Sequence, residues 1–138
     1  MQAITPYLNF NGNGAEALKF YAFALDGKIV HSQTFGESGM PVAEESKDRI
    51  MHALFEADKL QFMISDCQLG KEVSSGDQVH LSLNFESLES INKIFENLSE
   101  EGKVSMELQD TFWGARFGML TDKFGINWMF NHDKETNK

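Results

Sequence analysis

The sequence predicts an α+β fold made of two tandem βαβββ modules, and an internal repeat is the main reason. Leu8-Asn9-Phe10 recurs as Leu83-Asn84-Phe85, and Gly27-Lys28-Ile29 recurs as Gly102-Lys103-Val104, both at an offset of 75 residues. In each copy a strand pattern precedes a helix pattern, and further strand patterns follow. One offset kept at separate points indicates duplicated units. We expect one domain over 1–138 that contains module one (1–66), a linker (67–77), module two (78–132) and a polar tail (133–138).

Module one opens with an alternating pattern over 4–10, which is typical of a half-buried strand with Ile4 and Leu8 on its apolar side. Asn13, followed three residues later by Glu16, resembles a capping box and predicts the start of a helix. The helix is expected to end at Asp26-Gly27, and strands are expected at 28–35, 49–56 and 60–66 with a polar loop over 36–48.

Module two repeats this order of elements. An apolar stripe at helical spacing predicts a second helix with Ser87 as its N-cap. The stripe consists of Leu88, Ile91, Phe95 and Leu98. The closing hairpins also correspond, because Phe62-Met63-Ile64 matches Trp128-Met129-Phe130 at an offset of 66 residues. The turn of the second hairpin is expected at Asp122-Lys123-Phe124-Gly125.

Composition and charge exclude some functions. The formal net charge is -9 at pH 7, and the twelve basic residues are scattered. Phosphate binding requires a concentrated basic surface, so no nucleic-acid partner is expected. No run of eighteen apolar residues is present, which argues against a membrane-spanning segment. The single cysteine, Cys67, and the lack of a leader pattern after Met1 favour a cytoplasmic protein.

Several segments carry a resemblance to a known family. They are Ile4-Thr5-Pro6-Tyr7-Leu8, Glu16-Ala17, Phe20-Tyr21, Ile50-Met51-His52-Ala53, Met63-Ile64-Ser65-Asp66, and above all Phe112-Trp113-Gly114 through Asp122-Lys123-Phe124-Gly125 to Trp128-Met129. The chain resembles the vicinal oxygen chelate superfamily, which includes glyoxalases, extradiol dioxygenases and bleomycin-resistance proteins, and more closely its PhnB-like branch. The resemblance implies a curved mixed sheet around a cavity, helices on the outside, and pairing into a homodimer.

Metal-dependent members of that superfamily place four ligands on the cavity face, one on the first and one on the last strand of each module. The resemblance and the repeat locate these positions at Thr5, Met63, His80 and Met129. Hard and borderline divalent ions prefer imidazole and carboxylate, and methionine thioethers offer neither charge nor hardness. We therefore expect no divalent metal and no other cofactor. A soft ion such as Cu(I), held by the two methionines and His80, remains the alternative.

Strand alternation supplies the first candidate ligand-binding residues. It places Tyr7 and Asn9 on the face opposite the apolar side chains of the first strand. His80 stands at the corresponding place in module two, where the resemblance implies a ligand position, and imidazole is also suited to act as a general base. His52 is interpreted as a strand histidine with a structural role rather than as a base.

Three further candidates lie outside these faces. Asp66 either orients a ligand or caps the loop at 67–70. Trp113 offers a flat stacking surface and Arg116 a fork for a carboxylate or phosphonate, in a loop that the fold would place near the cavity mouth. The alternative is that Trp113 covers a sheet edge and Arg116 pairs with an acidic side chain.

Two functions follow from these residues. The first is binding of a small planar or oxygenated organic molecule without the usual divalent metal. The alternative is a lyase or isomerase that acts on a small oxygenated metabolite with His80 as general base. The sequence leaves open whether a reaction is catalysed.

Overall fold

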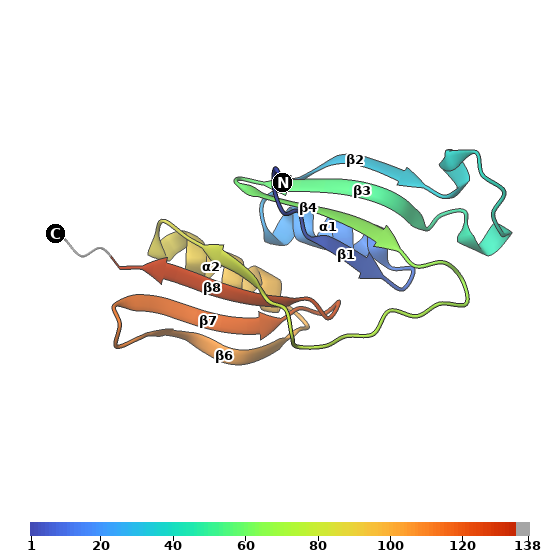
Figure 1. Ribbon diagram of the computed structural model, residues 1–138. Helices are drawn as coiled ribbons and strands as arrows, with labels where there is room; N and C mark the ends of the chain where they lie inside the picture. The colour runs from blue at the N-terminus through green and yellow to red at the C-terminus, as the bar shows by residue number, and fades with distance from the viewer. Residues whose placement is uncertain (135–138) are drawn as a thin grey trace. The chain divides into compact units, whose positions relative to one another are not determined.

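The computed structural model describes residues 1–134, and the chain divides into unit 1, Met1–Ser74, and unit 2, Ser75–Lys138. Unit 1 contains β1 (Tyr7–Phe10), α1 (Gly14–Ala24), β2 (Lys28–Thr34), the short helices η1 (Gly36–Ser38) and η2 (Glu44–Ser46), β3 (Ile50–Ala57) and β4 (Leu60–Asp66) (Figure 1). Unit 2 contains β5 (Leu81–Asn84), α2 (Leu88–Ser99), β6 (Lys103–Asp110), β7 (Ala115–Thr121) and β8 (Asn127–Asp133). The predicted βαβββ order is confirmed in each unit.

Each unit has one mixed four-stranded sheet. The strand orders are β1-β4-β3-β2 and β5-β8-β7-β6, and the first strand runs parallel to the last while the other pairs are antiparallel. Tyr7 lies opposite Met63, and Ser82 lies opposite Met129. These partners are related by 82 − 7 = 75 and 129 − 63 = 66, which are the two offsets of the sequence repeat. The repeat therefore extends to strand register.

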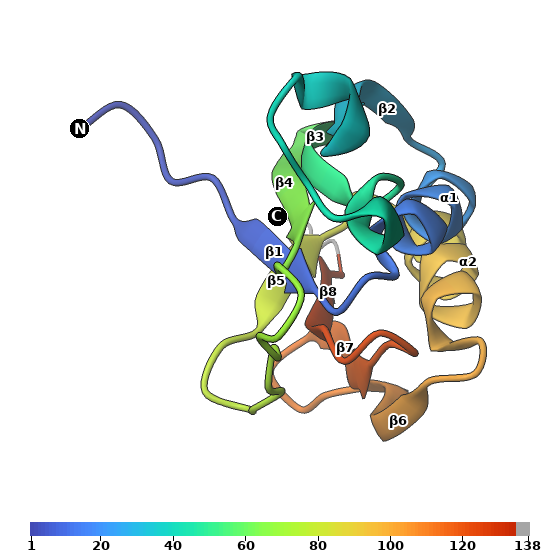
Figure 2. The same ribbon diagram turned by 90° about the vertical axis from the view of Figure 1, so that its right-hand side faces the viewer.

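Each sheet packs its apolar face against its own helix (Figure 2). In unit 1 the ring of Tyr21 on α1 meets Phe62 edge-on at 5.5 Å between centroids, and both residues are fully buried. In unit 2 the ring of Phe95 on α2 meets Phe130 at 4.9 Å. These contacts remove large aromatic surfaces from water, which stabilises each unit. The opposite face of each sheet is not covered by its helix.

The two helices begin differently from each other. Ser87 caps α2 as predicted, because its side-chain oxygen accepts a hydrogen bond from the backbone N–H of Ser90 at 3.1 Å. The predicted capping box at Asn13 is wrong, since the Asn13 side chain makes no cap hydrogen bond. Asp66, from the end of β4, accepts the N–H of Gly14 at 2.8 Å instead. A hydrogen bond from a residue distant in sequence, Asp66, thus takes the place of the predicted local cap by Asn13.

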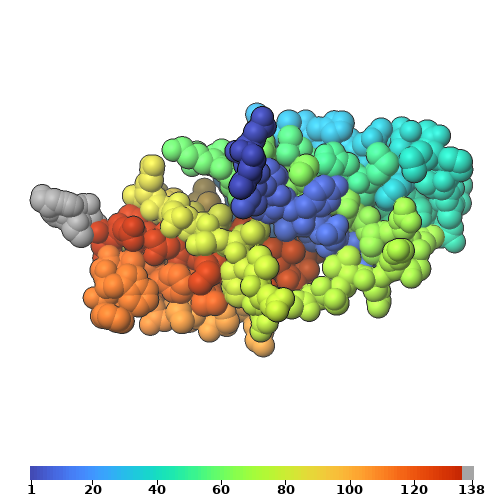
Figure 3. All heavy atoms as spheres, in the orientation of Figure 1, coloured from blue at the N-terminus to red at the C-terminus, as the bar shows by residue number. Residues whose placement is uncertain are grey.

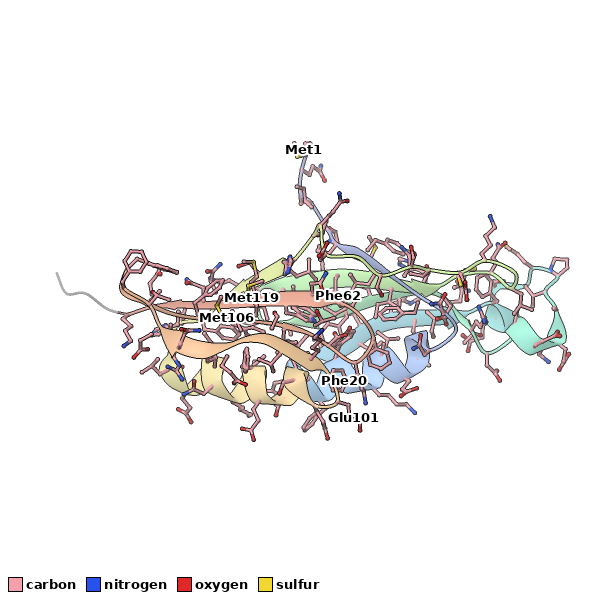
Figure 4. All side chains as sticks on the ribbon, turned by 90° about the horizontal axis from the view of Figure 1, so that it is seen from below. Met1, Phe20, Phe62, Glu101, Met106 and Met119 are labelled. Carbon is pink, nitrogen blue, oxygen red and sulfur yellow. The ribbon has the colours of Figure 1, made fainter. Side chains whose placement is uncertain are left out.

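The first strand is shorter than predicted. It begins at Tyr7 rather than at residue 4, and Ile4, expected on the buried side, is 86% exposed. Pro6 has no N–H for the strand ladder, although its carbonyl accepts the N–H of Met63 at 3.0 Å. The pairing therefore stops at Pro6. Met1 projects away from the rest of unit 1 in Figure 4, and the first residues stand out in Figure 3.

The predicted linker 67–77 contains no helix or strand among the described residues. Its two ends attach to different units. Asn11 donates its side-chain N–H to the carbonyl of Val73 at 3.1 Å and accepts the Val73 N–H at 2.7 Å. Asn127 donates to the carbonyls of Gly76 at 2.7 Å and Val79 at 3.1 Å. The unit boundary at Ser74 falls between these two attachment points.

The C-terminal strand β8 extends to Asp133, one residue past the predicted end of module two. The predicted frayed tail falls largely on 135–138, outside the described residues. Among residues 1–134, no helix has both the length and the apolar character needed to span a membrane.

Candidate ligand-binding site

The helix-free face of the unit 1 sheet carries a mixed set of polar and soft side chains. We call it the unit 1 open face, and it consists of Tyr7, Asn9, His31, Gln33, His52, Leu54, Glu56, Gln61, Met63 and Ser65. One row runs across all four strands, because Tyr7 lies opposite Met63, Met63 opposite Leu54, and Leu54 opposite His31. Tyr7 is 44% exposed and Asn9 is also exposed, so the predicted facing of both candidates is confirmed.

Tyr7 and His52 form a hydrogen-bonded pair on this face. The phenolic oxygen of Tyr7 lies 3.1 Å from Nδ1 of His52, and the ring centroids are 5.9 Å apart. The ring of His31 on β2 lies 6.3 Å from that of His52. A phenol and two imidazoles from three strands are thus gathered in one part of the sheet.

The role of His52 was missed by sequence reasoning. The available signal was alternation, because Ala53 is fully buried against α1 and its neighbour must therefore point to the other face. Alternation does not give the partner. Tyr7 reaches His52 across β4, a contact that depends on strand order β1-β4-β3 and on register.

A second polar pair recurs in both units at repeat-related positions. Ser65 Oγ donates to the side-chain oxygen of Asn9 at 3.3 Å. Asn131 Nδ2 donates to the side-chain oxygen of Asn84 at 3.3 Å. The two asparagines are 75 residues apart and their partners 66 apart, so this side-chain bridge belongs to the repeat. Asn9 keeps its side-chain amide N–H groups at the surface, where they are suited to contact a ligand.

The helix-free face of unit 2 carries a row of polarisable methionine side chains. Across its strands Ser82 lies opposite Met129, Met129 opposite Met119, and Met119 opposite Met106. Met106 and Met119 are labelled on their neighbouring strands β6 and β7 in Figure 4. Three thioether side chains in one row form a polarisable and flexible apolar strip, because methionine is unbranched. We call this row the methionine strip.

His80 precedes β5 by one residue and is half-exposed. β5 starts where it pairs with Trp128 near the beginning of β8, whereas Ala115 pairs with Asp133 at the other end of β8. His80 and the Trp113–Arg116 segment therefore lie at opposite ends of β8. The structure does not bring these three predicted site residues of unit 2 together.

Asp66 is buried and its carboxylate faces the backbone. One oxygen accepts the N–H of Gly12 at 3.0 Å and of Gly14 at 2.8 Å, and the other accepts the N–H of Ile50 at 2.8 Å. A Cβ atom placed on Gly14 would lie 2.9 Å from Asp66, so the glycine permits the close approach. Asp66 ties α1, β3 and β4 together, and its three backbone partners all lie outside the loop at 67–70 that it was expected to cap.

Trp113 lies in the turn between β6 and β7, whereas Arg116, predicted in the same loop, is the second residue of β7 and pairs with His132 of β8. Trp113 is 58% exposed and its ring meets Phe112, itself 97% exposed, edge-on at 5.1 Å. Arg116 is engaged on both sides, since its guanidinium donates to Asn92 at 3.1 Å and to Asp110 at 3.2 Å. The pairing with Asp110 matches the alternative in which Arg116 serves an acidic side chain.

Asp110 receives two cations. Lys134 Nζ lies 2.9 Å from one carboxylate oxygen, and Arg116 lies 3.2 Å from the other. The hydrogen bond from Lys134 lowers the pKa of Asp110 below its ordinary value of 3.8, and the bond from Arg116 adds to the effect. Asp110 is solvent-exposed, so this cluster is a surface ion pair and not a buried charge site.

The four positions at which the resemblance predicts metal ligands, Thr5, Met63, His80 and Met129, offer one hydroxyl, one imidazole and two thioethers. In unit 1 the facing pair is Tyr7 and Met63, with Thr5 two residues before Tyr7, and in unit 2 Met129 lies opposite Ser82. No group of three or more His, Cys, Asp or Glu side chains able to hold an ion occurs among residues 1–134. These positions do not fit a hard divalent ion, which prefers imidazole and carboxylate ligands.

Comparison with known proteins decides the family. A sequence model of the Glyoxalase/Bleomycin resistance protein/Dioxygenase superfamily matches residues 4–130. The chain belongs to this superfamily. It is 32% identical over 143 residues to Protein YjdN of Escherichia coli (strain K12), a match that covers 96% of each chain.

Solved structures agree with this assignment. Protein PA1353 from Pseudomonas aeruginosa has a TM-score of 0.87 and 38% identity, with 98% of this chain and 100% of that chain covered. A PhnB protein from Bacillus cereus has a TM-score of 0.80 and 27% identity, with 95% and 99% covered. The predicted superfamily, the PhnB-like resemblance and the α+β fold are confirmed.

Proposed function

We propose that this superfamily member binds a small planar or oxygenated organic molecule against its helix-free sheet faces, without a divalent metal. One observation carries the proposal: hydrogen-bonding side chains and soft apolar side chains share these faces. In unit 1 Tyr7, Asn9 and His52 flank Met63 and Leu54. Ligand sites typically combine an apolar lining with a few well-placed polar groups.

The row of side chains across the unit 1 open face favours a flat ligand. Side chains on one sheet face repeat at about 4.8 Å between strands, and the row from Tyr7 to His31 has an apolar centre with polar ends. A planar ring contacts such a surface over its whole face. Thioether sulfur also makes favourable contacts with aromatic rings, which the methionine strip of unit 2 would provide a second time.

A ligand screen tests the proposal. The wild-type protein is heated with a panel of quinones, catechols and flavones, with and without EDTA, and the midpoint Tm is recorded. A ligand at a hundred times its Kd stabilises the folded state by about 2.7 kcal/mol. We expect at least one compound to raise Tm by about 5 °C or more, equally in EDTA. The proposal fails if no member of the panel shifts Tm or binds in equilibrium dialysis.

A matched pair of variants locates the contact. Met119→Asp places a charge in the methionine strip and is expected to weaken binding of a strip-dependent ligand at least tenfold. Met40→Asp makes the same change in a loop outside both sheets, where Met40 is exposed, and is expected to leave binding unchanged. Far-ultraviolet circular dichroism confirms that both variants are folded.

The second candidate function is a lyase or isomerase with His80 as general base. The half-exposed position of His80 at the start of β5 leaves its imidazole accessible to a substrate. If a panel compound is turned over, His80→Gln should abolish turnover while binding persists. Turnover that survives this substitution would remove His80 from the catalytic role.

A further inference from the structure

Unit 1 contains one side-chain pair that is suited to recognise a particular atom of a ligand. We propose that Tyr7 and His52 form a subsite for an ionised oxygen, that of an enolate, phenolate or carboxylate, on a flat ligand body. This inference rests on the proposed binding function and adds the class of ligand and the residues that select it.

The hydrogen-bond chemistry of the pair always leaves a donor for a ligand. If the Tyr7 hydroxyl donates to Nδ1 of His52 across the 3.1 Å contact, the imidazole proton is on Nε2 and points elsewhere. If Nδ1–H donates to Tyr7, the phenolic O–H is the remaining donor. A protonated imidazole provides both. Each state therefore offers at least one N–H or O–H to an acceptor oxygen.

The open-face residues around the pair place no carboxylate beside it to repel a negative acceptor. The neighbouring titratable group is another imidazole, His31, at 6.3 Å between ring centroids. The acidic side chain on this face is Glu56, four residues along β3 from His52, and Gln61 donates a hydrogen bond to it at 2.9 Å. No carboxylate among the described open-face residues adjoins the pair. Hydrogen bonds to an ionised acceptor are about twice as strong as neutral ones.

The apolar part of the ligand would contact Met63 and Leu54. Met63 lies opposite Tyr7, and Leu54 lies opposite Met63, so both side chains are beside the pair on the same face. A ring resting on these two residues would present an edge oxygen to Tyr7 and His52. The guanidinium of Arg116 in unit 2 is less suited to this role, because Asp110 and Asn92 already accept from it.

Two compounds that differ in one group test the subsite. Lawsone is a flat hydroxynaphthoquinone whose enol oxygen is ionised at neutral pH, and its methyl ether has the same rings without the ionisable oxygen. Binding of each is measured by equilibrium dialysis at neutral pH. A hydrogen bond to a charged group typically contributes about 1.5–3 kcal/mol. We therefore expect the wild type to bind lawsone about tenfold to a hundredfold more tightly than the ether.

Variants test whether the preference for lawsone over its ether depends on Tyr7 and His52. His52→Gln and Tyr7→Phe should each reduce the preference to less than about threefold, mainly by weakening lawsone and not the ether. Ser32→Ala, on β2 but off the open face, should keep the wild-type preference, since Ser32 lies opposite Ala53. Nearly equal binding of the two compounds by the wild type, or an intact preference in His52→Gln, would overturn the subsite alone. Binding of neither compound would overturn the subsite and, with a silent panel, the proposed function as well.

Discussion

The indole nitrogen of Trp128 donates a hydrogen bond to Oδ2 of Asp122 over 2.9 Å, and both side chains are buried. The other oxygen of Asp122 accepts the backbone N–H groups of Phe124 at 2.8 Å and Ile126 at 3.1 Å. One carboxylate thus closes the turn between β7 and β8 and fixes the largest side chain of the unit 2 core. Asp122, which the sequence predicts in a tight turn, therefore holds the turn backbone and also a side chain of the core.

Asp122→Asn is expected to destabilise the protein by about 2 kcal/mol, because the amide replaces one acceptor oxygen and leaves a buried N–H unpaired. The matched control is Asp58→Asn. Asp58 is the repeat counterpart at an offset of 122 − 58 = 64 residues, but it is exposed in its turn with φ of 55°, which asparagine tolerates. Its effect should stay within about 0.5 kcal/mol. Urea unfolding compares the two, and equal losses would refute the role of Asp122.

This contrast shows how far the sequence predicts the structure. The repeat predicts the order of elements and which residues of the two modules correspond, since both follow from patterns that local sequence carries. It does not distinguish Asp58 from Asp122, because only Asp122 has a tryptophan within reach. His52 is a harder case, since its partner Tyr7 lies 45 residues away along the chain, whereas Trp128 is six residues from Asp122. Roles that depend on a partner distant in sequence require the register of the folded sheet.

Asp66→Asn should lower stability by about 2 kcal/mol or more, because three backbone N–H groups share its two oxygens. Both oxygens face the backbone, so the affinity for lawsone should remain within about twofold of wild type, a change worth less than about 0.5 kcal/mol. Urea unfolding and equilibrium dialysis measure the two effects. Loss of affinity at unchanged stability would instead make Asp66 a ligand-binding residue, which is one of the two alternatives that the sequence left open.

Ser87→Ala should cost about 1 kcal/mol, because the first turn of α2 loses the acceptor for the Ser90 N–H. Asn13→Ala is the matched control at the start of α1. The Asn13 side chain makes no cap hydrogen bond, and Asp66 already accepts the N–H of Gly14. Its cost should be close to zero in the same chemical unfolding experiment. A larger loss in Asn13→Ala than in Ser87→Ala would contradict this account of the two helix starts.

The repeated glycines Gly27 and Gly102 are explained by close packing. A Cβ atom at Gly27 would lie 2.5 Å from the carbonyl oxygen of Glu56, and one at Gly102 would lie 2.6 Å from that of Thr121. Gly27→Ala should therefore cost about 2 kcal/mol or more through overpacking. Gly76→Ala has open space around the new methyl group and should be neutral or stabilising by up to about 1 kcal/mol. Thermal and urea unfolding of the two variants should give opposite or clearly unequal shifts.

The ion cluster around Asp110 predicts a measurable change in its pKa. Because Lys134 provides the main stabilising contact, Lys134→Gln should raise the pKa of Asp110 toward its ordinary value of 3.8, and Arg116→Gln should raise it less. A lowered pKa means that the folded state binds fewer protons, so this contribution to stability is present above pH 3.8 and is lost as pH falls through the folded value.

An NMR titration of the Asp110 side-chain carboxyl carbon measures both variants. Added salt should shrink the difference, because exposed charges are screened. Lys103→Gln, at the opposite end of β6, should leave the titration unchanged, and a pKa of Asp110 that is the same in Lys134→Gln and wild type would show that the contact is not made in solution.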